Sequence, residues 1–391
     1  MRGLNTRALA TLSGGHLATD FASGSVPALL PFLVDEFDLS YAAAGAVMLV
    51  WAIASSVVQP LFGLWSDRRG AIWLLPGGLV LAGVGIGLTP VAGTYVLVLA
   101  CVAVSGLGTA AYHPEGSKFA AYASGDRRAS GMSLFSIGGN VGYALGPIAA
   151  TALVVWLGLR GGLLLALPPL VAAGALLALT PFLRSFDPGR GVARRRRGDD
   201  RPRAVALLLA VVGFRSLAWF GLLTFVPLYE VSLGHSEAYG NRLLALMLLA
   251  GGIGTLAAGP AADRVGLRPV LVGSVAATGP LIAAYLVLGG AVGAVALALV
   301  GVCVVGTFGV TMVMSQEYLP SRIGLASGLS IGLSIGLGGV AAVGLGALAD
   351  QIDLDRALWV CAAAPLVALA LAFRLPSSRS PARVEPEPAV L

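Results

Sequence analysis

Charged residues are scarce in this sequence. Asp, Glu, Lys and Arg make up 11% of its 391 residues, whereas soluble globular chains carry about 25%. Hydrophobic residues make up 57%, and the mean hydropathy is +0.88. The apolar residues fall in blocks near the ~20 residues that cross a ~30 Å hydrocarbon core, and the alternating segments of a membrane barrel are absent. The sequence therefore predicts an all-α, multi-pass membrane protein.

Other absences exclude several classes of activity. The three cysteines lie in separate apolar runs without redox or metal-ligand spacing, so we expect buried thiols and no metal site. The single lysine, Lys118, follows Ser117 where a phosphate-binding loop needs glycine, and no His-Glu-x-x-His or Gly-x-Ser-x-Gly occurs. The net charge of +6 is spread over loops, without a basic helix interleaved with aromatic residues. We therefore expect no cofactor, no nucleic-acid partner and no enzyme.

The apolar blocks divide into twelve expected spans, six on either side of a basic stretch that contains Arg194 to Arg197. We predict an N-terminal six-helix bundle over 1–183, a basic cytoplasmic linker over 184–203, a C-terminal bundle over 204–376 and a cytoplasmic tail over 377–391. The spans are expected near 9–33, 41–64, 72–90, 94–113, 129–153, 162–183, 204–229, 240–262, 269–288, 292–314, 323–347 and 357–375.

Basic residues set the expected orientation. With both termini in the cytoplasm, 21 of the 25 basic residues lie on the cytoplasmic side, and only Arg160, Arg242 and Arg356 lie outside. Cytoplasmic loops carry the excess of Lys and Arg in membrane proteins. We therefore predict a plasma (inner) membrane protein that sits in the lipid bilayer as a monomer.

A short charged pattern occurs twice, 196 positions apart, each time after an apolar span. Two copies at half-chain spacing indicate two related halves, which is the build of a secondary transporter. We interpret the pattern as a gate: its glycines permit a tight turn and close helix approach, and its Asp pairs with an Arg or a helix N-terminus. An ordinary charged turn is the alternative. The copies are Gly63-x-x-x-Asp67-Arg68-x-Gly70 and Gly259-x-x-x-Asp263-Arg264-x-Gly266.

These two loops resemble the signature loop of the major facilitator superfamily, and the resemblance covers roughly residues 9 to 375. It implies two pseudo-symmetric six-helix bundles and alternating access. Further stretches resemble the fosmidomycin-resistance group of efflux proteins. They are His16-x-x-x-Asp20, Gln59-Pro60, Tyr112-His113-Pro114-Glu115-Gly116-Ser117, Ser133-Leu134-Phe135-x-x-Gly138-Gly139-Asn140, Leu145-Gly146-Pro147, Arg215-Ser216, Phe225-Val226-Pro227-Leu228-Tyr229, Gln316-Glu317 and Ser327-Gly328-Leu329.

Two opposite charges stand near the middle of equivalent spans. A lone arginine at this depth costs roughly 2.5–3.5 kcal/mol, so Arg215 is expected to face a cavity or a partner. Asp20 is the predicted partner, with His16 one turn away on the same face. The pair is interpreted as a proton-coupling or substrate-binding group, with a purely structural ion pair as the alternative.

Other polar residues have two possible interpretations. His113 and Glu115 end span four, Gln316 and Glu317 end span ten, and all four either handle protons and substrate or serve as helix-end residues. Asn140 in span five either binds substrate or bridges helices. The list of residues expected to act in proton coupling or substrate binding is His16, Asp20, Arg215, Asn140, His113, Glu115, Gln316 and Glu317.

The fifth span also carries a glycine and proline pattern, Gly142-x-x-x-Gly146-Pro147, similar to the antiporter motif of drug-efflux proteins. It lacks an upstream glycine at Ser133 and the trailing glycine pair at Ala150-Thr151. A kink for helix packing is the competing interpretation, so this pattern does not decide between antiport and other modes.

The resulting hypothesis is a proton-coupled exporter of small polar or drug-like molecules, with a fosmidomycin-like compound implied by the resemblance. An importer or facilitator of an organic acid or sugar is the alternative, and an intramembrane enzyme or sensor is disfavoured. An Asp20–Arg215 pair would make protons and an anionic substrate bind together, as in symport. Export driven by an inward proton gradient instead requires that binding of the proton and binding of the substrate exclude each other.

Overall fold

The protein is described by a computed structural model that covers residues 4–69, 71–125, 128–186, 200–320 and 323–376. All regular elements in these ranges are helical, and twelve runs are long and apolar enough to cross a membrane, which confirms the predicted fold class. The elements are α1 (Thr6–Phe37), α2 (Tyr41–Ala52), the π-helix η1 (Ile53–Val57), α3 (Gln59–Arg69), α4 (Leu74–Leu88), the 3₁₀-helix η2 (Thr89–Val91), α5 (Tyr95–Ala123), α6 (Arg128–Leu157), the 3₁₀-helix η3 (Leu159–Ala166), α7 (Leu167–Arg184), α8 (Pro202–Ser232), α9 (Glu237–Val265), α10 (Leu267–Leu288), α11 (Gly290–Tyr318), α12 (Ile323–Ile352) and α13 (Leu354–Ala372).

Two expected spans are less regular than the sequence predicted. The second, expected near 41–64, contains the π-helix η1 between α2 and α3, and the sixth begins as the 3₁₀-helix η3. Hydroxyl side chains fix several helix starts: Ser40, Thr94 and Ser236 accept hydrogen bonds from backbone N–H groups of α2, α5 and α9. Such caps satisfy N–H groups that have no partner inside the helix.

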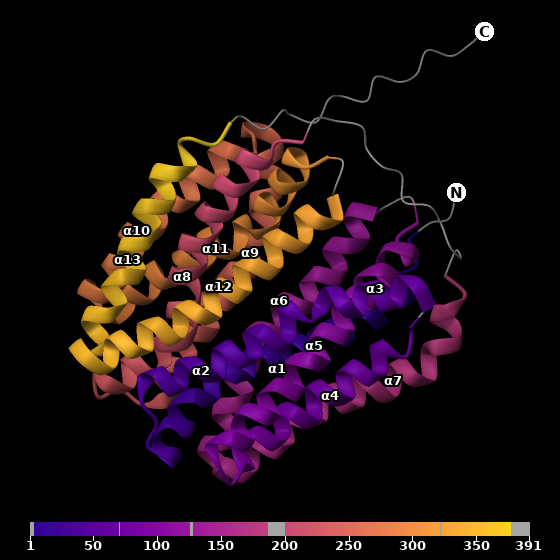
Figure 1. Ribbon diagram of the computed structural model, residues 1–391. Helices are drawn as coiled ribbons and strands as arrows, with labels where there is room; N and C mark the ends of the chain where they lie inside the picture. The colour runs from indigo at the N-terminus through magenta and orange to yellow at the C-terminus, as the bar shows by residue number, and fades with distance from the viewer. Residues whose placement is uncertain (1–3, 70, 126–127, 187–199, 321–322, 377–391) are drawn as a thin grey trace.

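The helices gather into two groups, α1 to α7 and α8 to α13 (Figure 1). Glycines allow the tightest packing within each group. A β-carbon at Gly142 of α6 would overlap the carbonyl oxygen of Leu17 in α1, and one at Gly301 of α11 would overlap that of Met247 in α9. In lipid the hydrophobic effect does not drive helices together, and small residues stabilise helix packing by allowing close van der Waals contact. The Gly142–Gly146 pattern therefore has a packing role, as the second interpretation expected.

The two groups touch at one end of the molecule and separate at the other. We call the end where α1 ends and α2 begins the distal end, and the end where α7 ends and α8 begins the linker end. One hydrophobic cluster joins both groups through residues such as Leu29 and Phe225. Two further clusters, around Leu12 and around Leu208, each belong to one group only. The molecule is therefore closed at the distal end.

Polar contacts strengthen the closed end. The carboxylate of Asp350 in α12 accepts hydrogen bonds from the backbone N–H groups of Tyr41 (2.8 Å) and Ala42 (3.0 Å) at the start of α2. We call this contact the distal latch. The buried Asn241 of α9 donates to the carbonyl oxygen of Ala28 (2.9 Å) and to the Thr151 hydroxyl (2.8 Å), both in the other group.

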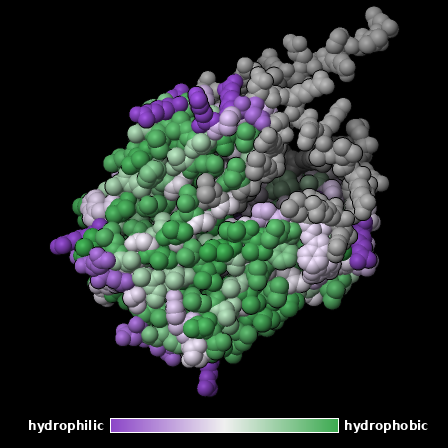
Figure 2. All heavy atoms as spheres, in the orientation of Figure 1, coloured by the Kyte–Doolittle hydropathy of each residue, from purple (hydrophilic) through white to green (hydrophobic). Residues whose placement is uncertain are grey.

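The face of the molecule seen in Figure 2 is mainly apolar, with hydrophilic residues gathered toward its two ends. This distribution is typical of a protein whose middle lies in hydrocarbon and whose ends lie in water. It places the region between the two ends, including the middle of α1 and α8, at membrane depth.

Candidate functional site: a cavity between the two helix groups

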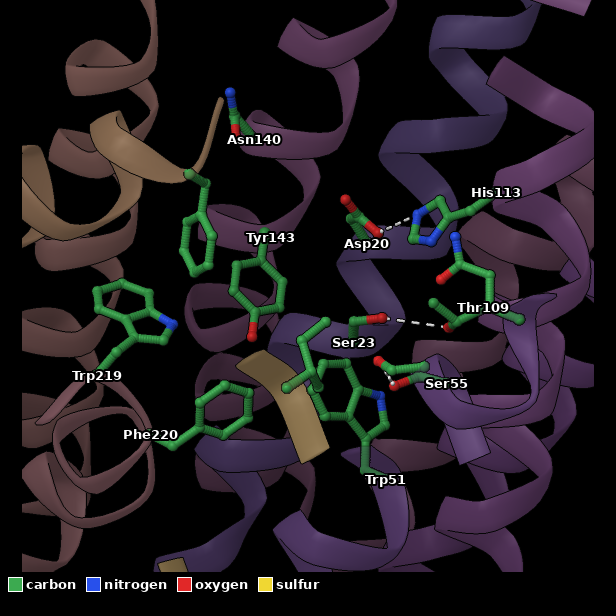
Figure 3. Close-up of a pocket in the computed structure, with 14 residues that line it drawn as sticks. Asp20, Ser23, Trp51, Ser55, Thr109, His113, Asn140, Tyr143, Trp219 and Phe220 are labelled. Carbon is green, nitrogen blue, oxygen red and sulfur yellow. Dashed lines mark hydrogen bonds and ion pairs between the residues drawn. The ribbon is translucent and has the colours of Figure 1, made fainter. Parts of the chain in front are cut away.

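A cavity of about 270 Å³ lies between the two groups, and its two walls differ in composition: polar and titratable side chains on one side, mainly aromatic rings on the other (Figure 3). Its size is near the lower end of the range for small-molecule pockets. Among the described residues, all lining Asp, His, Asn, Gln, Ser and Thr side chains belong to the first half of the chain. That half contributes Asp20, Ser23, Trp51, Ser55, Ser56, Gln59, Thr109, His113, Asn140 and Tyr143, and the second half contributes Trp219, Phe220, Phe308 and Ile335.

The π-helix η1 positions part of the polar wall. Consecutive residues of an α-helix point about 100° apart, yet Ser55 and Ser56 both line the cavity. The wider π turn brings them to the same side, with their hydroxyl oxygens 3.3 Å apart. Such single π turns occur frequently at functional sites. Gly106 of α5 allows the close approach, because a β-carbon there would lie 2.8 Å from that of Ala54.

Three titratable residues form one connected group in the polar wall, which we call the His–Asp–His triad. Asp20 Oδ2 lies 3.2 Å from His16 Nε2, and Asp20 Oδ1 lies 3.0 Å from His113 Nε2. All three side chains are only 13–24% exposed. Gly139 of α6 leaves room for them, because a β-carbon there would lie 2.5 Å from His16 Nε2 and 2.6 Å from Asp20 Oδ2.

The hydrogen bonds of His16 fix where its protons lie. Its Nδ1 is 2.8 Å from the carbonyl oxygen of Phe135, which can only accept, so Nδ1 is the donor. In a neutral imidazole the other nitrogen, Nε2, then carries a lone pair, and this atom faces Asp20 Oδ2. An ionised carboxylate is also only an acceptor. The contact therefore requires one additional proton, either on His16 or on Asp20.

The triad also has the composition of a transition-metal site, since one ligand atom from each residue lies within 4.8 Å of the others. No metal site was expected from the sequence, because its cysteines lack ligand spacing and no His-Glu-x-x-His occurs. In the structure, Asp20 Oδ1 forms a hydrogen bond with His113, and Asp20 Oδ2 forms an ion-pair contact with His16.

The predicted ion pair between Asp20 and Arg215 is not formed. Arg215 is 2% exposed, its Nη1 donates to the Thr307 hydroxyl at 2.9 Å, and its guanidinium lies over the Phe308 ring at 4.5 Å from the centroid. It does not line the cavity, whereas Asp20 does. Nε and Nη2 of Arg215 have no hydrogen-bond partner among the described residues. The prediction failed because depth in the membrane does not specify the direction in which a side chain leaves its helix.

Asn140 lies in the cavity wall, against Gly252 of α9. Glu115 is instead fully buried near the linker end, where it pairs with Lys118 (2.7 Å) and accepts from Ser66. Glu317 has one carboxylate oxygen, Oε2, without a partner in the part of the chain that the structure describes. Neither Glu115, Gln316 nor Glu317 lines the cavity, so the structure separates them from the triad.

The repeated loop pattern is only partly described. Gly70 and the side chains of Asp67 and Arg68 lie outside the described residues. Gly266 ends α9 with φ +96, so it is the turn glycine that the pattern predicted. Gly259 was expected to permit close helix approach, which is wrong, because no atom lies within 4 Å of a β-carbon there. A β-carbon at Gly63 would make an ordinary contact with Pro114 at 3.7 Å. Asp263 and Arg264 are exposed.

Sequence reasoning missed most of the cavity wall. It did not single out Trp51, Ser55, Ser56, Tyr143 or the aromatic residues of the second half. Adjacent serines inside an apolar span were the available signal, because buried hydroxyls at membrane depth need partners. The aromatic wall had no comparable signal, since aromatic residues occur throughout such spans.

Comparisons with known proteins agree on the family. The family model for the Major Facilitator Superfamily matches residues 12–343. The chain is 30% identical over 386 residues to the Fosmidomycin resistance protein of Escherichia coli (strain K12), with 95% of this chain and 93% of that protein covered. It is 32% identical over 381 residues to the MFS-type transporter YfnC of Bacillus subtilis (strain 168), with 93% and 91% covered.

Solved structures share the fold at low sequence identity. A bacterial homolog of the human lysosomal transporter Spinster superposes with a TM-score of 0.78 at 15% identity, covering 97% of this chain and 98% of the other. The nucleoside transporter NupG superposes with a TM-score of 0.74 at 13% identity, covering 94% and 99%.

Proposed function

The chain belongs to the major facilitator superfamily, and on this premise we propose that it is a proton-coupled exporter of a small polar, drug-like compound. It is a transporter and not an enzyme. Alternating access would expose the cavity first at the linker end and then at the distal end, as the two helix groups rock against each other. The similarity to a protein named for fosmidomycin resistance supports export and a fosmidomycin-like substrate.

The observation that carries proton coupling is the contact between His16 and Asp20. Two acceptor atoms 3.2 Å apart hold one exchangeable proton between them, for the reason given above. His113 contacts the other oxygen of the same carboxylate and lines the cavity, so it offers a route by which this proton is gained or lost. Histidine and carboxylate chains are the usual proton relays of membrane transporters.

Exchange requires that proton and substrate exclude each other. Asp20 and His113 both line the cavity, so a hydrogen-bond donor or a cationic group of a substrate that binds to them competes with the proton for the same atoms. Because Arg215 is bonded to Thr307 instead, protonation of Asp20 does not free a guanidinium for an anion. The coupling of protons and anions in one direction that an Asp20–Arg215 pair would produce is therefore not expected.

Proton flux in liposomes reconstituted with the purified protein tests this proposal. Adding fosmidomycin to liposomes with an imposed proton gradient should produce proton movement opposite to that of the substrate. Asp20→Asn should abolish proton movement, because an amide does not take up the shared proton. Asp35→Asn, at the exposed end of the same helix, is the matched control and should behave as the wild type. Proton and substrate movement in the same direction would instead support the importer alternative, and Asp20→Asn with unchanged proton flux would exclude this role for the triad.

We further propose that the protein sits in the plasma (inner) membrane as a monomer, with both termini and the linker in the cytoplasm. The basic residues of the linker and the twelve spans support this orientation. The closed distal end would then face the outside.

A further inference from the structure

The spacing of the His–Asp–His triad is close to that of the ligands around a metal ion. Around a tetrahedral Zn²⁺, bonds of ~2.0–2.1 Å place neighbouring ligand atoms about 3.3 Å apart. Asp20 Oδ2 already lies 3.2 Å from His16 Nε2, and Asp20 Oδ1 lies 3.0 Å from His113 Nε2. Because no two of the ligand atoms are more than 4.8 Å apart, movements of about 1.5 Å or less would bring all three to one ion.

The orientation of His16 is a second, independent indication of a metal ligand. Its Nδ1 donates to the carbonyl oxygen of Phe135 at 2.8 Å, and its ring stacks on the Phe135 ring with centroids 4.1 Å apart. Histidines that bind metals almost always donate their other ring N–H to a carbonyl or carboxylate, which fixes the tautomer and the ring. The Nε2 lone pair of His16 is held in this way toward the Asp20 carboxylate.

The triad is open toward the cavity on one side, since Asp20 and His113 both line it (Figure 3). Three protein ligands with one open position are the arrangement of zinc sites that bind a further molecule, here water or an oxygen atom of a molecule in the cavity. Imidazole nitrogen favours transition metals, whereas Ca²⁺ and Mg²⁺ prefer all-oxygen sites with more ligands. Among the described residues that line the cavity there is no Lys or Arg, so no fixed positive charge in its wall repels a cation.

We propose that the triad binds one divalent transition-metal ion with the chemistry of Zn²⁺, through His16 Nε2, His113 Nε2 and the Asp20 carboxylate. The proton shared by His16 and Asp20 leaves to bulk water as the ion enters, and His113 binds in the tautomer that carries its hydrogen on Nδ1. The ion and the shared proton therefore exclude each other. This inference goes beyond proton-coupled export and does not depend on it, because binding of the ion needs neither a substrate nor a proton gradient.

Zn²⁺ binding to the full-length protein, purified in detergent without a histidine tag, tests the proposal by isothermal titration calorimetry. The wild type should bind one ion per chain. His113→Gln should weaken binding more than about 100-fold, because loss of a ligand costs more than the ~10–100-fold loss caused by removing an outer partner. His235→Gln is the matched control at the third histidine of the chain, which pairs with Glu230 and is 50% exposed, and its affinity should stay within about twofold of the wild type.

A second pair of variants tests the geometry of the site without removing a ligand. Gly139→Ala would place a methyl group 2.5 Å from His16 Nε2 and 2.6 Å from Asp20 Oδ2, and it should weaken Zn²⁺ binding by about tenfold or more. Gly14→Ala, with no atom within 4 Å of the added carbon, is its control. Thermal unfolding with and without Zn²⁺ separates a lost site from misfolding, because an ion that binds the folded state raises the unfolding temperature.

The inference is overturned if the wild type shows no saturable Zn²⁺ binding, if folded His113→Gln binds as tightly as the wild type, or if His235→Gln loses as much affinity as His113→Gln. Each result is distinct from failure of the proposed function. Zn²⁺ binding that depends on His113, in a protein that moves no protons in liposomes, would retain the metal site and reject proton coupling. Proton movement that depends on Asp20, in a protein that does not bind Zn²⁺, would do the reverse.

Discussion

Asp20 and Arg215 illustrate what the environment of a single charge decides. Both lie near the middle of equivalent spans, but Asp20 contacts two histidines of its own half, and Arg215 contacts Thr307 and Phe308. Each charge therefore has separate neighbours. The cost of removing one charge does not depend on whether the other is present.

This separation predicts additive effects. Asp20→Asn and Arg215→Gln should each change the thermal stability of the purified protein, and the double variant should show the sum of the two changes within about 0.5 kcal/mol. If the two side chains were in direct contact, the double variant would instead be more stable than either single variant, because no unpaired charge would remain. Thermal unfolding of the four proteins in the same detergent measures the difference, and clear recovery would contradict the geometry described here.

The sequence alone identified His16, Asp20, His113 and Asn140 as candidates, and the structure brings all four to one cavity or its edge. Their shared character, polar groups in apolar spans, is visible without coordinates. The orientation of Arg215 was not predictable in this way. Near Arg215, α8 is buried around almost its whole circumference. The sequence there is therefore not amphipathic and does not indicate which face of the helix is turned toward the cavity.

At the scale of helices, the contact between α1 and α6 holds the triad in place. Gly139→Ala should place a methyl group against His16 and Asp20, and we expect loss of proton-coupled transport with the fold retained. Gly14→Ala is the control: it lies on α1, the helix of His16 and Asp20, with no atom within 4 Å of the added carbon, and should leave transport unchanged. Proton flux in liposomes and thermal stability together check this prediction. Normal coupling in Gly139→Ala would show that the triad tolerates displacement.

The distal latch joins α12 to α2 through a carboxylate at a helix N-terminus. Asp350→Asn removes the negative charge that favours this position, a contribution of about 0.3–1 kcal/mol, and should shift the equilibrium toward a form open at the distal end by about two- to fivefold. Spin labels at Glu36→Cys and Gln351→Cys, in a variant without native cysteines, report the separation of the two groups by pulsed spin-resonance distances.

Asp353→Asn is the control for the latch. Asp353 caps α13 by accepting from the Arg356 N–H at 2.9 Å, so its contact stays within one half of the chain. The label distances should therefore match the wild type in this variant. An equal shift in both variants would indicate a general effect of lost charge at the distal end, and no shift in Asp350→Asn would show that the latch contributes little.

Element boundaries were predictable where a cap or a charged loop marks them, as at Ser40 and Ser236. The π-helix η1 was not, because its sequence, Ile53 to Val57, reads as the middle of an apolar span. A π turn inserts one additional residue per turn, and composition does not reveal it. The position of Ser55 and Ser56 in the cavity wall could not be predicted for the same reason.

The whole molecule offers a test of orientation. If the termini are cytoplasmic, a cysteine at Glu36 should react with a membrane-impermeant maleimide on intact cells, whereas a cysteine at Arg374 should react only after the membrane is permeabilised. Both positions are exposed, at the distal end and at the linker end respectively, so access to the reagent decides the result. The reverse pattern would place the closed end in the cytoplasm.

The unequal walls of the cavity also bear on the speed of the rocking motion. Ring and isoleucine side chains hold a neighbour by dispersion forces, which have little directionality, whereas each hydrogen bond restrains a neighbour in position and angle. A substrate bound in this cavity would keep its position relative to the first half. The second half would move past it with few substrate hydrogen bonds to break. Opening the distal end would instead require breaking directional contacts between the halves, namely those of Asp350 and Asn241.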